Sequence, residues 1–210
     1  MKGAIFDVDG TILDSMGVWF KVTERFFDAH GLTFTQELAD EYKEMTLEES
    51  LPYIRTLFGL DMTFEEIFEE FRAMVAEEYR DNIELKKGAD IYIRRLHEDG
   101  VRIAVATSGY ENMCKSAFGR LGILDYIDEY AFSSEVGTNK GSPAIYRLAA
   151  KRLGVQESDC VVFEDIVKGI TSAGEAGFMT CAVYDETNRN ETEELKRLAD
   201  RYIVSWEELL

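Results

Sequence analysis

The sequence has little of what several large classes of protein require. It contains two histidines and three scattered cysteines in 210 residues, which argues against a zinc site or a disulfide framework. The same scarcity argues against a Ser/His/Asp triad or a Cys/His pair. No apolar run approaches the roughly 20 residues of a membrane span, and the N-terminus lacks a signal-peptide pattern. We therefore expect a cytoplasmic protein with reduced thiols.

Positive charge is also scarce. The chain has 23 Lys and Arg residues against 41 Asp and Glu residues, for a net charge of −18. Nucleic acids and anionic membranes are bound through clustered basic residues, so neither is an expected partner. An anionic substrate would have to be held by a metal ion, a placed lysine or helix N-termini. Only two prolines and 46% hydrophobic residues predict a fully folded globule.

Residues 15–82 carry helical signals only. The sequences TLEE at 46–49 and TFEE at 63–66 match capping boxes, and each opens an apolar series with helical spacing. A further apolar stripe precedes them, at Trp19, Val22 and Phe26. We predict that 15–82 forms a helical subdomain inserted into the rest of the chain.

The remainder of the chain alternates between strands and helices. Strands are predicted at 3–8, 101–107, 130–134, 160–165, 179–183 and 202–204. Helices are predicted at 90–99, 111–121, 143–153, 167–176 and 190–200. Because the strands are almost continuously apolar, the pattern favours a parallel sheet covered on both faces. We predict an α/β fold, with a doubly wound parallel-sheet core formed by 1–14 and 83–210.

Polar residues follow several of these strands. Asp7 and Asp9 end the first strand, Thr107 and Ser108 end the next long one, and Glu164-Asp165 ends the strand at 160–165. Each feature alone is most simply a cap, a turn or a solvated group. In a doubly wound sheet, however, the carboxyl ends of the strands line the ligand site. Together with Lys140, which precedes a predicted helix, they predict one site.

This constellation resembles the haloacid dehalogenase superfamily, in the branch with an inserted helical cap where the β-phosphoglucomutase-like phosphatases belong. The DVDGT sequence at 7–11 looks like the first motif, Thr107 the second, Lys140 the third and FED at 163–165 the fourth. The resemblance spans essentially the whole chain. One departure is visible, because the branch usually has Lys-Pro-x-Pro-Asp where this chain has KGSPA at 140–144. We expect a looser backbone beside the lysine.

Phosphoryl transfer needs an in-line nucleophile, positive charge on the phosphate oxygens and an acid for the leaving group. The resemblance implies that Asp7 is the nucleophile and forms an aspartyl-phosphate, while Asp9 moves the protons. Asp7, Asp165 and the Asp9 carbonyl are the oxygen ligands that Mg²⁺ prefers. Glu164 is assigned either to direct metal ligation or to a water-mediated contact.

The phosphate group is assigned to residues from three segments. The Thr107 hydroxyl and the Ser108 amide are expected to hold phosphate oxygens, and Lys140 is expected to neutralise the remaining charge. Gly10 allows close approach of the backbone, and Thr11 can tie the turn.

The expected substrate is a small phosphorylated metabolite. Within the superfamily, dehalogenases lack an acid at the position of Asp9 and phosphonatases have a small residue there, so the resemblance implies a phosphate ester. The alternative is a β-phosphoglucomutase-like mutase, which holds its bisphosphate with a cap arginine and a histidine. Leu47 and Trp19 stand at those positions, which favours hydrolysis. A receiver-like module is a third possibility, but it would not require a helical insertion.

Overall fold

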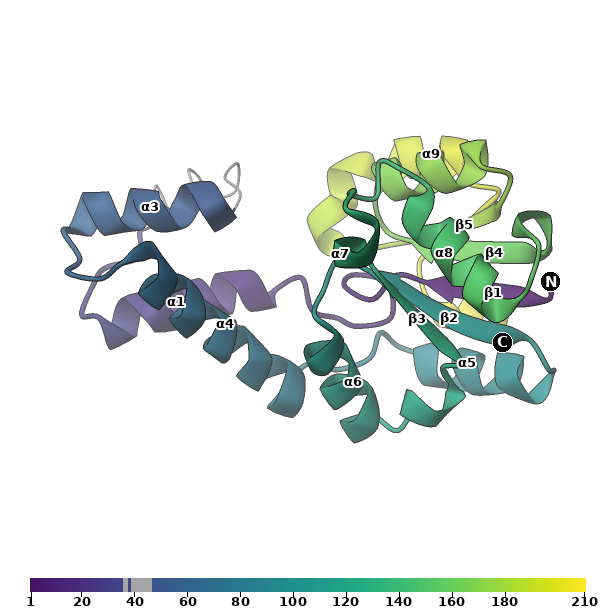
Figure 1. Cartoon of the computed structure of the whole chain (residues 1–210), viewed down its shortest axis with the longest axis horizontal. Helices are drawn as coiled ribbons and strands as arrows, with labels where there is room; N and C mark the ends of the chain where they lie inside the picture. The colour runs from purple at the N-terminus through teal and green to yellow at the C-terminus, as the bar shows by residue number, and fades with distance from the viewer. Residues whose placement is uncertain (36–37, 39–46) are drawn as a thin grey trace. The chain divides into compact units, whose positions relative to one another are not determined.

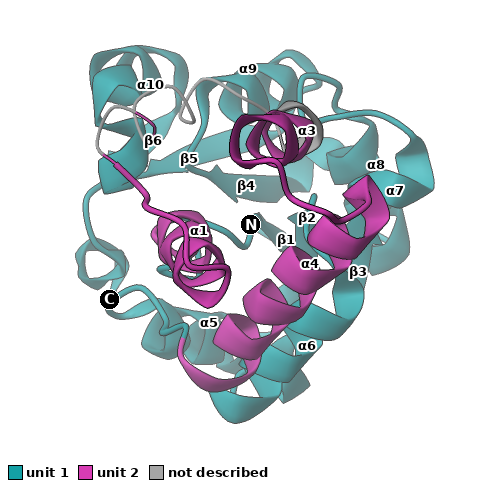
Figure 2. Cartoon of the chain, turned by 90° about the vertical axis from the view of Figure 1, so that its left-hand side faces the viewer, with its two compact units in different colours: residues 1–16, 83–210 teal, residues 17–82 magenta. Residues whose placement is uncertain are grey.

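The computed structural model describes residues 1–35, 38 and 47–210. The chain divides into two compact units, one formed by Met1–Met16 and Ile83–Leu210 and the other by Gly17–Asn82 (Figures 1 and 2). We predicted the first boundary two residues earlier, between residues 14 and 15. Each unit is described below by itself.

The larger unit is built on a six-stranded sheet in the order β3-β2-β1-β4-β5-β6, and all neighbouring strands are parallel (Figure 2). The strands are β1 (Gly3–Phe6), β2 (Arg102–Thr107), β3 (Glu129–Phe132), β4 (Cys160–Glu164), β5 (Met179–Val183) and β6 (Arg201–Ile203). Strand β1 therefore lies at the centre, where Ile5 pairs with Ala104 of β2 and Val162 of β4. This arrangement confirms the predicted doubly wound α/β fold.

Helices cover both faces of the sheet, which is why its strands are largely apolar. On one face, α8 (Ala144–Leu153) and α9 (Val167–Glu175) share a buried cluster with Ile5, Ala104 and Val162. On the other face, Tyr92 of α5 (Ala89–Glu98) packs edge-on against Phe163, and Trp206 packs against it at a tilt. The remaining helices of this unit are α6 (Glu111–Arg120), α7 (Ser133–Val136) and α10 (Thr192–Leu198). Short 3-10 helices lie at Leu124–Tyr126, Glu157–Asp159, Glu186–Glu191 and Trp206–Leu209.

Two predicted strands end two residues earlier in the structure than we expected. Strand β1 stops at Phe6, because the Val8 carbonyl accepts hydrogen bonds from the amides of residues 11, 12 and 13 and the chain turns there. The strand predicted at 130–134 ends at Phe132. The short helix α7 begins at Ser133, and Glu135 in its first turn accepts a hydrogen bond from the Phe132 amide at 2.9 Å.

The helix predicted at 190–200 is preceded by a turn of 3-10 helix, Glu186–Glu191. Asp185 caps that turn by accepting a hydrogen bond from the Thr187 amide at 2.9 Å. This Asp-x-Thr signal was overlooked in the sequence. The turn carries Asn188, which contacts the site described below.

The smaller unit is helical, with α1 (Val18–Ala29), α3 (Leu47–Phe58) and α4 (Phe64–Asp81). Thr63 and Glu66 form the predicted capping box of α4, whereas Thr46 of the other predicted box lies outside the described residues. The buried side of α1 includes Val18, Val22 and Phe26, and Trp19 is 46% exposed. Placing Trp19 on the apolar stripe was therefore wrong, because the buried stripe begins one residue earlier.

The two histidines lie at helix ends, and the three cysteines are buried. His30 ends α1 and its Nε2 lies 3.1 Å from a Glu70 carboxylate oxygen, while His97 lies in the last turn of α5. Cys114, Cys160 and Cys181 are free and buried. None of the helices in the described part of the chain has the length and apolar character needed to cross a membrane.

Candidate active site

The predicted site residues lie at the carboxyl edge of the sheet in the larger unit. Asp7 directly follows β1, Thr107 ends β2, and Glu164 ends β4 with Asp165 next to it. Since β1 lies between β2 and β4, these three strand ends are neighbours. Lys140 reaches the same edge from the loop between α7 and α8.

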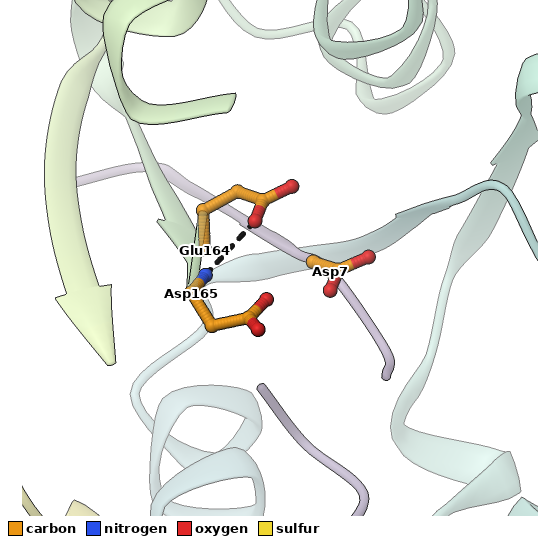
Figure 3. Close-up of side chains that lie close together, drawn as sticks. All are labelled: Asp7, Glu164 and Asp165. Carbon is orange, nitrogen blue, oxygen red and sulfur yellow. Dashed lines mark hydrogen bonds between the residues drawn. The ribbon is translucent and has the colours of Figure 1, made fainter. Parts of the chain in front are cut away.

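Three carboxylates converge at the ends of β1 and β4. Asp7, Glu164 and Asp165 are almost completely buried, at 2%, 0% and 2% exposure. One oxygen from each lies within 4.8 Å of the others, and Figure 3 shows the three side chains around a common space. Carboxylates buried this close together repel each other and lose their hydration, so they require a compensating cation or a proton.

Lys140 supplies one such cation. Its ammonium pairs with Asp7 Oδ1 and lies 2.6 Å from Glu164 Oε1. The side chain is 9% exposed, so water screens these ion pairs weakly. Lys140 thus balances one of the three negative charges that the ionised carboxylates would carry.

The pKa values reflect this excess of negative charge. Burial raises the pKa of Asp7 to about 7; Lys140 opposes the shift and Glu164 adds to it. Burial, followed by the charges of Glu164 and Asp7, raises the pKa of Asp165 to about 9. Burial acts to lower the pKa of Lys140, but the charges of Asp7 and Glu164 outweigh it and raise the pKa. The raised pKa values of Asp7 and Asp165 mean that a cation binding to these two groups would displace protons.

These donors fit a hard divalent cation. Asp7 and Asp165 are buried oxygen donors close to each other, and oxygen donors are what Mg²⁺ prefers. After pairing with Lys140, the three carboxylates retain two uncompensated negative charges when ionised. A divalent cation would neutralise these two remaining charges.

Glu164 is fixed by four hydrogen-bond donors. Its Oε1 accepts from the Tyr146 hydroxyl at 3.0 Å and from Lys140. Its Oε2 accepts from the amides of Asp165 at 2.8 Å and Ile166 at 3.2 Å; the first of these is the dashed line in Figure 3. Both oxygens are therefore occupied by protein donors.

Asp165 is held from two sides. Its Oδ1 accepts from the Thr11 hydroxyl at 3.2 Å, and its Oδ2 accepts from the Asn188 amide group at 2.7 Å. Gly10 makes this packing possible, because a Cβ there would collide with Asp165 Oδ2. Gly10 also has a φ of 81°, which disfavours any other residue.

Asp9 and Thr107 each have a side-chain oxygen beside Gly109. Asp9 Oδ1 accepts a hydrogen bond from the Ser15 hydroxyl at 2.7 Å, and Thr107 Oγ1 accepts one from the Gly109 amide at 2.9 Å. A Cβ on Gly109 would lie 3.4 Å from Asp9 Oδ2 and 3.3 Å from Thr107 Oγ1, so both oxygens face Gly109. The Asp9 carboxylate is separate from the three-carboxylate group.

Ser108 differs from its neighbour Thr107. Its side chain is exposed, and its hydroxyl lies 2.9 Å from that of Ser133. The role predicted for Ser108 rests on its backbone amide, and the position directly after β2 leaves that amide at the carboxyl edge of the sheet.

Three residues of the site were missed by sequence reasoning. Tyr146 looks like an apolar residue of α8, but a buried tyrosine hydroxyl requires a partner, which was the available signal. Asn188 follows β5, so the strand-end rule could have included it. Ser172 donates a hydrogen bond to the Lys140 carbonyl at 2.6 Å, and nothing local in the sequence indicates this contact.

The fold and the strand-end site define a doubly wound α/β enzyme with a buried acidic centre. The model of the haloacid dehalogenase-like hydrolase family matches residues 4–183. The chain therefore belongs to this family, as its motifs predicted.

Several relatives with named activities are phosphatases, and one is named as a haloacid dehalogenase. The chain is 32% identical over 207 residues to a Drosophila melanogaster protein named "Probable pseudouridine-5'-phosphatase", with 93% of this chain and 89% of that protein covered. It is 26% identical over 181 residues to the phosphorylated carbohydrates phosphatase of Thermotoga maritima, with 84% and 82% covered. These similarities identify the chain as a phosphatase of the hydrolase family.

Solved structures show the same fold. The β-phosphoglucomutase from Clostridium difficile superposes with a TM-score of 0.74 at 20% sequence identity, covering 100% of this chain and 93% of that one. At this identity, the likeness is evidence for the fold alone.

Proposed function

We propose that the protein is a Mg²⁺-dependent phosphatase that hydrolyses a small phosphorylated metabolite through an aspartyl-phosphate on Asp7. The observation that carries the proposal is the contact of Asp7 with Lys140, beside the carboxylate of Asp165. This arrangement combines a carboxylate nucleophile, a fixed positive charge and donors for a divalent cation, which are the requirements of phosphoryl transfer.

The first half of the reaction uses both aspartates of the β1 turn. A carboxylate oxygen of Asp7 forms a bond to phosphorus while the bond from phosphorus to the ester oxygen breaks. Asp9 donates a proton to the leaving alkoxide. Thr107 and the Ser108 amide hold phosphate oxygens, and Lys140 offsets their charge.

The second half restores the enzyme. Water attacks the phosphorus of the aspartyl-phosphate, and Asp9 accepts the proton that the water loses. The bond between phosphorus and Asp7 breaks, which releases inorganic phosphate and regenerates the carboxylate. Asp9 can serve in both halves because its carboxylate lies outside the group formed by Asp7, Glu164 and Asp165.

Asp7, Asp165 and the Asp9 carbonyl are the proposed Mg²⁺ ligands. When bound, the ion supplies positive charge that offsets the repulsion between the carboxylates and the phosphate. We assign Glu164 to holding Lys140 instead of direct ligation, because each of its oxygens already accepts two hydrogen bonds. Each oxygen of Asp165 accepts one from a side chain.

The proposed substrate class rests on the two relatives, whose names give a nucleoside 5'-phosphate and phosphorylated carbohydrates. We propose a small phosphorylated sugar derivative. We further propose that residues 15–82 form a cap domain and that 1–14 with 83–210 form the catalytic core. The proposed cap has six Lys and Arg residues against sixteen Asp and Glu residues, which favours a leaving group with little negative charge of its own.

A panel of phosphate esters tests the proposal. The wild type with Mg²⁺ is expected to release phosphate from a sugar phosphate or a nucleoside monophosphate, and Asp7→Asn is expected to lose this activity. Asp14→Asn is the matched control, because Asp14 is exposed. An Asp7→Asn variant with wild-type turnover would disprove the nucleophile assignment.

The alternative is a mutase that moves phosphate within a sugar phosphate. The structural likeness to a β-phosphoglucomutase concerns the fold, and Trp19 and Leu47 stand where the mutase has phosphate-binding residues. The side chain of Leu47 lies outside the described part of the structure. Formation of glucose 6-phosphate from β-glucose 1-phosphate, stimulated by the bisphosphate, would support the mutase and overturn the assignment as a simple hydrolase.

A further inference from the structure

We propose that Tyr146 and Ser172 are positioning residues for Lys140. Tyr146 acts through Glu164 on the ammonium group, and Ser172 acts on the backbone of Lys140 itself. The inference rests on the proposed function, because it explains how the cation that contacts Asp7 is kept in place.

Tyr146 is linked to Lys140 through two hydrogen bonds that share one oxygen of Glu164. The Tyr146 hydroxyl donates to Glu164 Oε1 at 3.0 Å, and Lys140 Nζ lies 2.6 Å from the same oxygen. Tyr146 and Glu164 are each 0% exposed, so water cannot replace a lost donor without entering the core. The position of Glu164 Oε1, and with it that of the ammonium, therefore depends on the Tyr146 hydroxyl.

The packing around Tyr146 and Glu164 leaves their side chains little room to move. Gly169 of α9 lies so close that a Cβ there would be 2.6 Å from Glu164 Cδ and 2.7 Å from the Tyr146 hydroxyl. The absence of a side chain at this position lets the tyrosine and the glutamate meet. Neither group can shift toward α9, since the Gly169 backbone stands in the way.

The second contact holds the other end of Lys140. Ser172, which is 4% exposed, donates from its hydroxyl to the Lys140 carbonyl at 2.6 Å. Gly141 follows Lys140 directly, so the chain has intrinsic freedom at this point. The Ser172 hydrogen bond ties the Lys140 backbone to α9, in addition to the local turn in which the Gly141 amide donates to Asn139 Oδ1 at 3.0 Å.

The two contacts fix both ends of a long, flexible side chain. A lysine has many rotamers, and ordering its side chain costs conformational entropy. If that order is established in advance, the ammonium is already placed when the phosphate arrives. A displacement of about 1 Å in such a group can cost about 100-fold in rate.

A double-mutant cycle tests the role of Tyr146. Tyr146→Phe keeps the ring and removes the hydroxyl, and we expect kcat to fall about tenfold, the effect of losing one hydrogen bond to a charged group. Lys140→Met removes the charge while keeping a long side chain. In the Lys140→Met background, Tyr146→Phe is expected to change kcat by less than about twofold, because the group it positions is gone. Tyr92→Phe, at another buried tyrosine, is the matched control and is expected to retain wild-type kcat.

The placement of Lys140 can also be measured without turnover. Reductive methylation followed by peptide mass spectrometry gives the rate at which each lysine is modified. We expect Lys140 to react about tenfold faster in Tyr146→Phe and in Ser172→Ala than in the wild type. A factor of about ten corresponds to the loss of one hydrogen bond to a charged group. Exposed Lys168 is the internal reference and should not change.

Each outcome decides between the possibilities. An equal loss of kcat in both backgrounds, or an unchanged labelling rate at Lys140, would show that Tyr146 and Ser172 serve packing alone and would overturn the inference. If the wild type hydrolyses no phosphate ester, the proposed function fails, and the labelling rates still decide whether the two residues position Lys140.

Discussion

Replacing Gly169 with alanine is expected to destabilise the protein, although this change usually stabilises a helix. Gly169 lies inside α9, and alanine is favoured over glycine in helices by up to about 1 kcal/mol. The new Cβ, however, would lie 2.6 Å from Glu164 Cδ and 2.7 Å from the Tyr146 hydroxyl. Both neighbours are buried and hydrogen-bonded to each other, so they cannot move aside freely.

The size of the effect follows from two costs. Overpacking a buried site costs about 1–3 kcal/mol, and loss of a hydrogen bond to a charged group costs about 1.5–3 kcal/mol. After subtraction of the helix gain, the free energy of unfolding should fall by about 1.5–5 kcal/mol. For a chain of this length, each kcal/mol corresponds to about 2–4 °C, so we expect Tm to fall by about 3–20 °C.

The same helix provides the control. A Cβ on Gly174 would have Thr180 Cγ2 as its nearest neighbour, at 3.9 Å, which is an ordinary contact. Gly174→Ala should therefore raise Tm or leave it unchanged. Thermal unfolding followed by circular dichroism, at one pH and one Mg²⁺ concentration, compares the two variants with the wild type. A Gly169→Ala variant that melts at or above the wild-type Tm would refute the assigned packing, and so would an equal loss in Gly174→Ala.

Two further predictions concern the metal ligands. Asn188→Ala removes the donor to Asp165 Oδ2 and should weaken Mg²⁺ binding by about 10-fold or more, measured by titration calorimetry; exposed Asn190→Ala is the control, and equal affinities would contradict the role of Asn188. Because burial raises the pKa of Asp7 to about 7 and that of Asp165 to about 9, both bind protons more tightly in the folded state. The tighter proton binding adds to the free energy of unfolding. This contribution is complete below the ordinary pKa near 4 and is lost as the pH rises through 7 and 9, so the Tm of the metal-free protein should fall as the pH is raised to 9. Mg²⁺ should oppose the fall, and a metal-free Tm that rises from pH 6 to 9 would contradict the sign.

Much of the site could be predicted because it follows the strand-end rule. The apolar strands and the helices between them indicate a parallel sheet, and the rule then brings Asp7, Thr107 and Asp165 to one edge. Lys140 was assigned by its motif, and the structure places its ammonium against Asp7. The catalytic roles of these residues remain predictions, which the experiments above test.

The supporting contacts could not be predicted in the same way. Tyr146 and Glu164 come from a helix and a strand whose relative placement is set by packing, and no periodicity encodes the distance between their side chains. Asn188 depends on a short 3-10 turn capped by Asp185, which a search for longer helices passes over. Trp19 was misplaced because an apolar residue at the first turn of a helix can lie on either side of the buried stripe.

The central claim is that phosphate is transferred to Asp7 before it reaches water. The wild type is mixed with Mg²⁺ and a phosphate ester that it hydrolyses, and the reaction is quenched rapidly with acid. Borohydride then reduces an aspartyl-phosphate to homoserine, which peptide mass spectrometry locates in the chain. We predict homoserine at position 7 in the wild type and its absence in Asp7→Asn. Homoserine at another aspartate, or wild-type hydrolysis by Asp7→Asn, would contradict the account.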